Sequence, residues 1–464
     1  MSRAPRWPGL LLALGVLWGG GGCPGPGECF NSPTSQQPDK QLFEVGREVS
    51  LQVPVGVTTF CDGDTVPQQV PQSVTVEVYG PENEPISATA QLSPGGERAT
   101  VRFTPVVTGR FHVLVAFAPV GSLQQFGVFV AEDRRQEAPM ERLTWTTTCP
   151  YVDRTLQGTW LCGPLAMRGP QGTLQALSND SQHTVVAGDV VWVVDGARVV
   201  RYVDTGTGPL VSTGDAAFPP DRRPGDSIAP LHTRLATGDE LLLLGDTHLY
   251  RYTFSAQGAV SAAPATRWTS QYNPGLGLDQ TAGLMVRAGA RVLVVGVIQD
   301  TVTFELRAQA CPFQVSTATG AYIPVPHETC QRLVGDVVGY EDGVVWTRTS
   351  AFSNNSGRVE TLRRYEASGG QLVEESALAL DGQMLINVPP LRPGPTFPSL
   401  LGSNGFGVGP YAAPRWRAEK RALELELIPA PFNTSPARLG QRYLWTESQG
   451  GGVAVYPRVR PSNP

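Results

Sequence analysis

Short runs of alternating apolar and polar residues, separated by turns rich in Gly and Pro, fill most of the chain. Between residues 41 and 133 five such runs have the length of strands. Period-two alternation of this kind predicts an antiparallel β-sandwich, because one face of each strand is buried and the other is solvated. The runs are EVSLQVPV (Glu48 to Val55), SVTVEVYG (Ser73 to Gly80), ATVRFTPV (Ala99 to Val106), GRFHVLVAF (Gly109 to Phe117) and QFGVFVAE (Gln125 to Glu132).

From residue 143 to residue 464 the chain repeats a unit of turn, apolar strand, tight turn and further strands. Gly188-Asp189 is matched by Gly238-Asp239, and Arg201-Tyr202 by Arg251-Tyr252, at equal spacing. A third copy brings Gly289 near the expected position, and a fourth contains Arg364-Tyr365. A single four-stranded sheet cannot bury both of its faces, so such units are expected to stack around a common axis.

The residues that recur in each unit have expected roles. Glycines 188, 238 and 289 are expected to permit a tight entry into each inner strand. The tyrosines at 202, 252 and 365 are expected to fill the space between neighbouring sheets. A ligand-stacking surface is the alternative, but regular recurrence at an apolar strand end favours core packing.

Two segments resemble known folds. The repeats resemble β-propellers of the kelch or quinoprotein-like type, which implies six or seven blades. TPVVTGRFHVLVAF (Thr104 to Phe117) resembles the closing strands of bacterial immunoglobulin-like domains. The expected fold is therefore all-β, with an immunoglobulin-like β-sandwich over residues 41–133, a charged linker over 134–142 and a β-propeller over 143–464. The tryptophan-docking repeat of quinoprotein dehydrogenases is missing, so no such cofactor is expected.

The first 23 residues resemble a bacterial lipoprotein signal peptide. Arg3 and Arg6 precede a short apolar core, and a glycine run leads to Cys23, although Gly20 stands where a lipobox has Leu. The resemblance implies a signal peptide over residues 1–22, a lipid on Cys23 and a location in the cell envelope, at the outer membrane or cell surface. Residues 23–40, rich in Pro, Gly, Ser and Gln, are expected to form a tether.

The other six cysteines form three neighbouring couples, namely Cys29 with Cys61, Cys149 with Cys162, and Cys311 with Cys330. An even number of cysteines is expected of an exported protein with three disulfides, and neighbour pairing is one of fifteen possible connectivities. The net charge of -5 and the absence of a basic stripe argue against nucleic acid as a partner.

Signatures of catalysis and of metal binding are absent from the sequence. The five histidines (112, 183, 232, 248 and 327) form no close pair and no zinc motif. Asp62-Gly63-Asp64 lacks the further ligands of a calcium loop and predicts a turn. Carboxylates at strand ends (Asp195, Asp246, Glu341 and Asp342) would serve a glycosidase only if two faced each other across a substrate. No catalytic residue, cofactor or metal ligand is therefore nominated.

Two functions remain open. One is a noncatalytic envelope lipoprotein whose propeller binds or scaffolds a protein or glycan partner, with contact loops at SAFSNNSGRVE (Ser350 to Glu360) and in the Pro-rich stretch from Asn387 to Gly407. The alternative is a secreted or surface polysaccharide hydrolase or lyase with an axial active site. Clustered carboxylates and aromatic residues at the axis would favour the enzyme.

Overall fold

The computed structural model of the protein describes most of the β-rich part of the chain, and every regular element in that part is a strand. The described segments contain no helix that is long and apolar enough to cross a membrane. They are residues 29–33, 42–55, 57–61, 70–133, 138–145, 149, 151–169, 172–178, 181–195, 198–217, 229–235, 238–245, 248–267, 284–299, 306–326, 328, 330–341, 343–353, 357–381, 385–387, 399–401, 411–427, 438–439, 442–447 and 452–457.

The N-terminal part is a sandwich of two sheets, and each of the five predicted runs forms a strand in it. Side chains from both sheets meet in one apolar core that includes Leu51, Val101, Phe111 and Val113. One sheet has the order β6 (Pro85–Ile86), β5 (Ser73–Tyr79), β9 (Gly109–Ala118) and β10 (Ser122–Asp133), with β2 (Leu42–Glu44) parallel to β10. The other has the order β3 (Val49–Pro54), β8 (Arg98–Phe103) and β7 (Ala88–Leu92).

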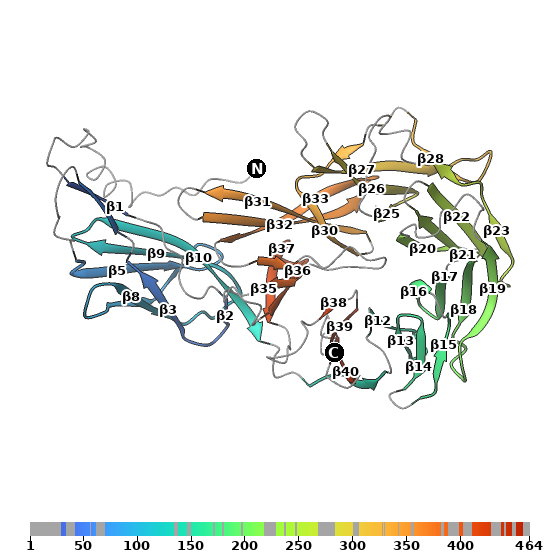
Figure 1. Cartoon of the computed structure of the whole chain (residues 1–464), viewed down its shortest axis with the longest axis horizontal. Helices are drawn as coiled ribbons and strands as arrows, with labels where there is room; N and C mark the ends of the chain where they lie inside the picture. The colour runs from blue at the N-terminus through green and yellow to red at the C-terminus, as the bar shows by residue number, and fades with distance from the viewer. Residues whose placement is uncertain are drawn as a thin grey trace.

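The rest of the chain folds into successive antiparallel sheets that follow one another around a ring, an arrangement of β-propeller type (Figure 1). In most of these sheets the first strand lies toward the centre of the ring and the fourth toward its outside. The first two sheets are β12 (Val152–Arg154), β13 (Thr159–Cys162), β14 (Leu165–Arg168) and β15 (Leu174–Ala176), then β16 (Ser181–Ala187), β17 (Val190–Asp195), β18 (Arg198–Val203) and β19 (Val211–Ala217).

The next three sheets continue the same order. They are β20 (Ala229–Leu235), β21 (Gly238–Leu244), β22 (His248–Ser255) and β23 (Val260–Ala262), with β24 (Thr266–Arg267) beside β22; then β25 (Leu284–Ala288), β26 (Arg291–Gln299), β27 (Leu306–Val315) and β28 (Tyr322–Pro324), with β29 (Gln331–Arg332) beside β27; and then β30 (Asp336–Glu341), β31 (Val344–Ser353), β32 (Gly357–Ser368) and β33 (Gln371–Asp381).

Two further sheets differ from this plan. The strands β34 (Leu385–Asn387), β35 (Ser399–Leu401), β36 (Tyr411–Arg417) and β37 (Ala422–Leu427) join the sandwich sheet, as described below. The last sheet takes β38 (Arg438–Leu439), β39 (Tyr443–Glu447) and β40 (Gly452–Pro457) from the end of the chain and β11 (Glu141–Thr144) from a much earlier segment.

Alternation along each second strand explains how the sheets stack. On β17, Val191 and Val193 pack toward the β12–β15 sheet, whereas Val190, Trp192 and Val194 pack toward the β20–β23 sheet. Successive side chains of a strand point to opposite faces, so a continuously apolar strand supplies both interfaces. The near-uniform apolar runs of the repeats therefore mark strands that are buried on both sides.

Three segments predicted to be irregular contain strands. The strand β11 begins at Glu141, inside the segment expected to be a linker, because its backbone completes the last sheet by pairing with β40. The strand β1 (Cys29–Pro33) lies inside the expected tether, where it pairs with β4 (Val57–Cys61). The predicted contact loop from Ser350 to Glu360 is largely strand as well, because β31 and β32 extend the hairpin through it.

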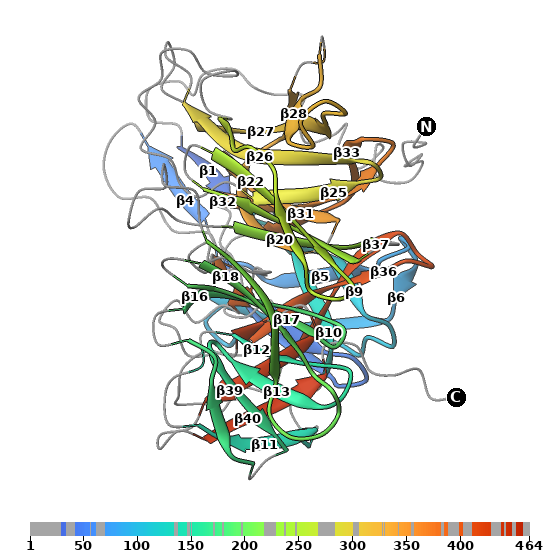
Figure 2. The ribbon, with the colours of Figure 1, turned by 90° about the vertical axis from the view of Figure 1, so that its right-hand side faces the viewer.

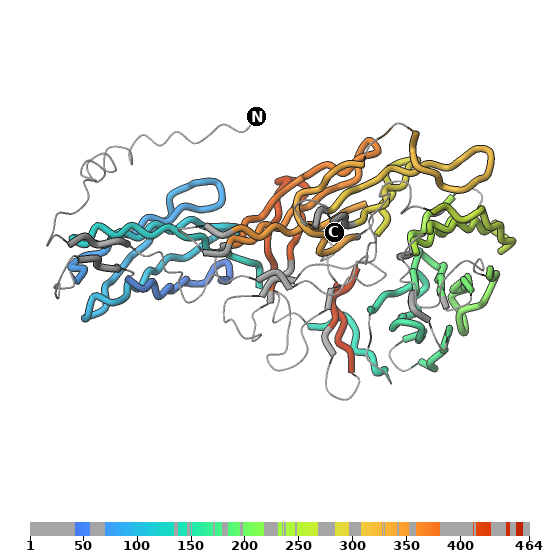
Figure 3. Tube along the Cα trace, turned by 45° about the horizontal axis from the view of Figure 1, so that its top comes forward, coloured from blue at the N-terminus to red at the C-terminus, as the bar shows by residue number. Residues whose placement is uncertain are grey.

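The sandwich and the propeller-type part share a sheet. The last residues of β10 pair in parallel with β37, with Glu132 opposite Glu426 and Asp133 opposite Leu427. Within the described residues this joins eight strands in the order β34-β35-β36-β37-β10-β9-β5-β6, with β2 also on β10. Figures 1 and 3 show the blue and cyan sandwich on one side and the green to red sheets on the other, meeting at this point.

Apolar side chains reinforce that junction. Phe129 and Ala131 of β10 pack with Trp346 of β31 and with Leu425 of β37 in a single buried cluster. Their neighbours on β10, Val128 and Val130, point into the sandwich core instead. One strand therefore contributes to two cores, with the sandwich core on one face of the shared sheet and the junction cluster on the other.

A carboxylate with three partners lies at the same place. Glu424 accepts hydrogen bonds from Thr108 of the sandwich at 2.9 Å, from Arg417 at 3.0 Å and from Lys420 at 2.9 Å. Burial alone would raise the pKa of Glu424, but these donors outweigh it and hold the pKa below its usual range. The ionised form of Glu424 is thus the one that stabilises the junction.

Acid is expected to weaken the junction through Glu424. Because its folded-state pKa is lowered, its stabilisation is present above the unfolded pKa of about 4.3 and is lost as the pH falls through the folded value. We expect Glu424→Gln to reduce the difference between the urea midpoints measured at neutral pH and at about pH 3. An unchanged difference would show that Glu424 does not contribute to the acid sensitivity.

Candidate functional site

The candidate site lies where the β12–β15 sheet meets the last sheet, on the inner strand β12. Asp153 accepts hydrogen bonds at Oδ1 from Arg442 Nε at 3.0 Å and Nη2 at 2.6 Å, and from the backbone N–H of Arg154 at 2.8 Å. The Arg154 guanidinium lies 5.0 Å from the centroid of the Trp160 ring, and that ring lies 5.2 Å from Tyr443. The cluster therefore combines one carboxylate, two guanidinium groups and two aromatic rings.

The pKa of Asp153 is raised, whereas the pKa of Glu424 at the junction is lowered. Burial of Asp153 raises its pKa, and this effect outweighs the opposing effects of Arg442 and of the Arg154 N–H. Its side chain is 21% exposed, so solvent reaches it. A carboxyl group with a raised pKa can act as a general acid or base nearer neutrality than an ordinary aspartate. The ion pair with Arg442 also gives it a structural role, since it connects the first complete sheet to the last.

A second cluster connects the β16–β19 and β20–β23 sheets. Asp239, on β21, is completely buried and accepts from Arg201 of the preceding sheet, at 2.9 Å from Nη2 and 3.2 Å from Nε. His232 Nε2 lies 3.1 Å from the other oxygen of Asp239. Arg201 also donates to Thr213 at 2.7 Å, and its guanidinium lies 5.8 Å from the Trp192 ring. Arg201 thus satisfies its charge entirely within the interface.

The next residue of β21 serves the opposite interface. Glu240 accepts from Arg251 at 2.7 Å and from Arg287, which belongs to the following sheet. The Tyr322 hydroxyl, also of the following sheet, lies 3.3 Å from the same Glu240 oxygen that Arg287 contacts. Since neighbouring side chains of a strand point to opposite faces, the Asp239-Glu240 dipeptide fastens the β20–β23 sheet to both of its neighbours.

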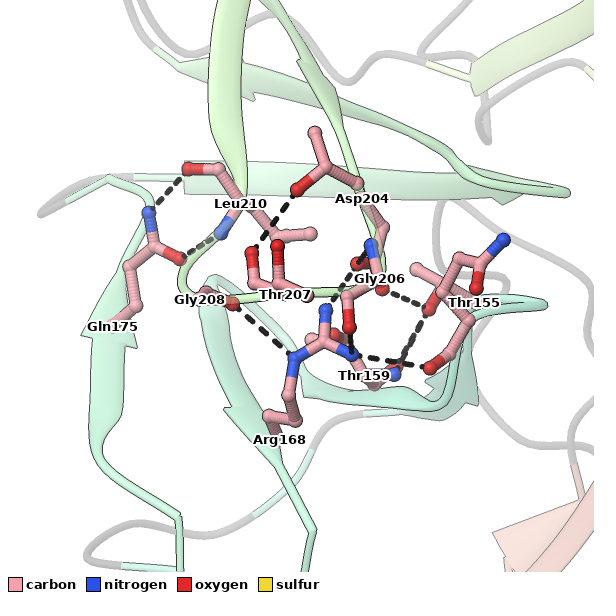
Figure 4. A network of polar contacts seen from close by, with 11 residues as sticks. Thr155, Thr159, Arg168, Gln175, Asp204, Gly206, Thr207, Gly208 and Leu210 are labelled. Atoms are coloured by element: carbon pink, nitrogen blue, oxygen red, sulfur yellow. Dashed lines mark hydrogen bonds and ion pairs between the residues drawn. The ribbon is translucent and has the colours of Figure 1, made fainter.

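A third network, shown in Figure 4, joins the β12–β15 and β16–β19 sheets. Asp204 accepts from the Thr155 hydroxyl at 2.5 Å, from the Gly206 N–H at 3.0 Å and from Arg168. Burial alone would raise the pKa of Asp204, but the hydrogen bonds, led by that from Thr155, lower it. Arg168 also donates to the carbonyl groups of Gly206 at 3.0 Å and Gly208 at 3.2 Å. The network holds the turn between β18 and β19 in place.

The recurring tyrosines have the predicted packing role. Tyr252 is buried among Val190, Trp192 and Leu241, and Tyr365 is buried among Leu284 and Val295 of the preceding sheet. Tyr202 packs partly buried in the equivalent cluster and donates its hydroxyl to the Leu177 carbonyl at 2.9 Å. The interpretation as interface packing is confirmed for all three.

The recurring glycines occupy a different position from the predicted one. Gly188 and Gly289 have φ angles of 64° and 66° in the hairpins that leave the inner strands, between β16 and β17 and between β25 and β26. Such left-handed backbone is available to glycine without strain. Gly188 and Gly289 thus permit the turn out of an inner strand and not the entry into it, whereas Gly238 is the first residue of the second strand, β21, with a φ angle of 153°.

Two of the three cysteine couples form disulfides in the structure, Cys149 with Cys162 and Cys311 with Cys330. Cys149 and Cys162 lie in the core that also contains Leu143 of β11 and Val455 of β40. The first bridge therefore fastens the beginning of the β12–β15 sheet beside the sheet that contains both ends of the propeller-type part. Cys29 and Cys61 are opposite each other in the β1–β4 ladder, while their side chains and all of Cys23 lie outside the described part.

Loss of the Cys149–Cys162 bridge is expected to destabilise the protein. The bridge encloses 12 residues, and closing a loop of this length in the unfolded chain is worth about 3 kcal/mol. We therefore expect the double substitution Cys149→Ala and Cys162→Ala to lower the free energy of unfolding by about that amount, measured by urea denaturation. A midpoint equal to that of the wild type would rule out this contribution.

The other residues singled out in the sequence are only partly described. His112 lies half-buried on a sandwich strand, as predicted, whereas His248 begins β22 with its ring 6.1 Å from that of Tyr250. Within the described part no three potential ligands gather to hold a metal ion. The remaining candidates lie outside what the structure describes, either as whole residues (Asp62, Asp64, Asp246, His327 and Asp342) or as side chains (His183, Asp195 and Glu341), as does most of the Pro-rich stretch.

Sequence reasoning missed Asp153, Asp204 and Glu240. Their partners are distant in the sequence, so no local spacing marks them. The sequence signal for ion pairs between sheets was the recurrence of an aspartate after glycine, at Asp189 and Asp239, and of an arginine before tyrosine, at Arg201 and Arg251.

Several solved structures resemble this chain at low sequence identity. No known protein family matches the chain, and no curated protein does. Among solved structures, a protein from Lactobacillus plantarum is 13% identical over 78% of this chain and 98% of its own, with a TM-score of 0.33. The periplasmic gluconolactonase of Pseudomonas aeruginosa is 14% identical over 78% and 100%, with a TM-score of 0.26, and a Bombyx mori β-fructofuranosidase is 9% identical over 75% and 83%, with a TM-score of 0.24. These similarities carry no inference about activity.

Proposed function

We propose that this protein is an exported, noncatalytic lipoprotein of the cell envelope, anchored through a lipid on Cys23, whose propeller binds or scaffolds an envelope protein or glycan. The observation that carries the proposal is the sheet shared by β10 and β37, because it fixes the propeller on the sandwich. A binding surface held at a constant position relative to its anchor suits a scaffold. The two disulfides support export, since such bonds persist in oxidising compartments.

The proposed domain organisation follows the sheet orders. We assign residues 41–133 to an immunoglobulin-like sandwich and residues 143–464, together with β11, to a propeller of seven blades. Six of the blades take their four main strands in chain order, and the last takes its outer strand from β11. Pairing the first strand of a propeller with the last strands is one way to close a ring of blades, because it leaves no gap between the ends.

The contact surface is proposed to lie on the turns of the propeller. The Asp204 network holds the turn from Thr205 to Gly208, and the glycine carbonyls inside it are already occupied by Arg168. Turns braced in this way change little on binding, which lowers the entropic cost of association. The residues to probe are therefore Thr205 and Thr207, together with the residues in the turns between the third and fourth strands of the other blades.

Site-specific photocrosslinking in the native envelope tests the binding role. A photoreactive amino acid at position 207 of the propeller is expected to capture a defined envelope protein or glycan. The same amino acid at position 91 of the sandwich, also in an exposed place, is the matched control and is expected to capture far less. Equal capture at the two positions, or none at any propeller turn, would contradict a propeller-borne binding surface.

A polysaccharide hydrolase or lyase is the second candidate, and the raised pKa of Asp153 beside Trp160 and Tyr443 is the observation in its favour. Trp160 is 1% exposed, however, so its ring cannot stack on a sugar. The release of reducing ends from envelope polysaccharides distinguishes the two functions. We expect none from the wild-type protein, whereas release that Asp153→Asn abolishes would establish the enzyme.

A further inference from the structure

Two cysteines outside the observed disulfides are brought together by the backbone. In the antiparallel ladder between β1 and β4, Cys29 is the direct partner of Cys61, and Pro33 is the partner of Val57. Opposed residues in such a ladder have Cα atoms about 4.5 to 5.5 Å apart. Disulfides form across Cα separations of about 4.4 to 6.8 Å. The register therefore places the two cysteines at bridging separation.

This pair of strands lies at the end of the sandwich that faces away from the propeller. The strand β4 follows β3, whose last residue, Pro54, accepts a hydrogen bond from Gln124 at 2.9 Å near the β9–β10 turn. The opposite end of β10 is the one that reaches β37. Figure 1 shows β1 at the end distant from the propeller, and Figure 2 shows β1 beside β4.

We propose that Cys29 and Cys61 form a third disulfide, which ties the segment after Cys23 to this distal end of the sandwich. The two thiols lose two protons and two electrons to a protein disulfide of the exporting compartment, which is reduced to a dithiol. The same class of oxidant forms the Cys149–Cys162 and Cys311–Cys330 bridges.

The bridge fixes the length of chain between the membrane anchor and the folded body. This consequence rests on the proposed lipid on Cys23. The pairing of β1 with β4 brings the folded body to Cys29, and the bridge makes that attachment covalent, so that only residues 24–28 separate the anchor from the folded body, instead of the whole expected tether to residue 40. The six Cα steps from Cys23 to Cys29 span at most about 20 Å, whereas the seventeen steps from Cys23 to Lys40 span about 60 Å. The sandwich is therefore held close to the lipid surface, and its length sets the distance of the propeller.

Peptide mapping of the full-length protein from its native membrane, without reduction, tests the bridge. Trypsin cuts after Lys40, Arg47 and Arg98, so the peptides Cys23–Lys40 and Glu48–Arg98 carry the two cysteines. We expect them as one linked species that separates on reduction. Alkylation of Cys29 and Cys61 before reduction would overturn the proposal, as would a linkage of either to another cysteine.

The same map separates this inference from the lipid anchor. An acyl mass on Cys23 with free Cys29 and Cys61 would overturn the bridge and leave the anchor intact. A linked pair without an acyl mass would keep the bridge and overturn the anchor.

The short distance between the sandwich and the lipid surface is tested by energy transfer. The donor dye is at position 91, on β7, and the acceptors are lipids in vesicles that carry the anchored protein. The double variant Cys29→Ser and Cys61→Ser is expected to lower the transfer efficiency at least twofold. Cys311→Ser with Cys330→Ser removes a different bridge and is expected to preserve the efficiency. An unchanged transfer efficiency in the first variant would contradict the claim that the bridge sets the distance between the sandwich and the lipid surface.

Discussion

Replacing Asp239 by alanine is expected to lower the free energy of unfolding by about 3–5 kcal/mol, because it leaves the guanidinium of Arg201 buried without its carboxylate. Arg201 is 5% exposed and Asp239 is not exposed at all, so water cannot take the place of the lost partner. The effect is measured as the shift of the urea midpoint at constant slope.

The matched control is an ion pair on the β16–β19 sheet, which carries Arg201. Arg198 and Asp215 lie 3.7 Å apart with side chains more than half exposed. Exposed pairs of this kind contribute about 0–1 kcal/mol, so Asp215→Ala is expected to change stability little. Equal losses in the free energy of unfolding for the two substitutions would contradict the claim that the buried Arg201–Asp239 pair stabilises the contact between neighbouring sheets.

Replacing Phe129 by alanine is expected to cost about 3–5 kcal/mol and to separate the unfolding of the sandwich from that of the propeller. Phe129 is 1% exposed and packs in the junction cluster with Trp346 and Leu425. Its loss leaves a cavity between the two parts and weakens their coupling, which then rests on the short β10–β37 pairing and on polar contacts such as that of Thr108 with Glu424. Differential scanning calorimetry is expected to show one transition for the wild type and two for the variant.

Phe126 provides the control, because it lies on the same strand but packs into the sandwich core. Phe126→Ala is expected to lower stability without dividing the transition, since the junction cluster remains intact. Two transitions in the wild type would show that the parts unfold independently, contrary to the shared sheet.

The strands of the sandwich and the stacking of the repeats were predictable because both follow from local periodicity. Alternation marks a strand, and the recurrence of Arg201-Tyr202 in later units marks an interface that is built repeatedly from the same two residues. The buried role of Tyr252 and Tyr365 follows from the same recurrence.

The junction could not be predicted from the sequence. Parallel pairing of Asp133 with Leu427 joins residues almost three hundred positions apart and leaves no local pattern. The segment around Glu141 is charged and suggested a linker, but its backbone pairs with β40, and backbone pairing does not depend on side-chain polarity. Asp153 and Arg442 are likewise brought together only when the first and last sheets meet.

The fixed placement of the propeller on the sandwich is tested most directly by pulsed electron resonance distances between spin labels at positions 91 and 212. Both positions are exposed, one on β7 of the sandwich and one on β19 of the propeller, and labels on unnatural amino acids leave the native cysteines untouched. We predict a single narrow distance distribution. A broad distribution, as expected for two domains joined only by a flexible linker, would contradict the shared sheet and the scaffold built on it.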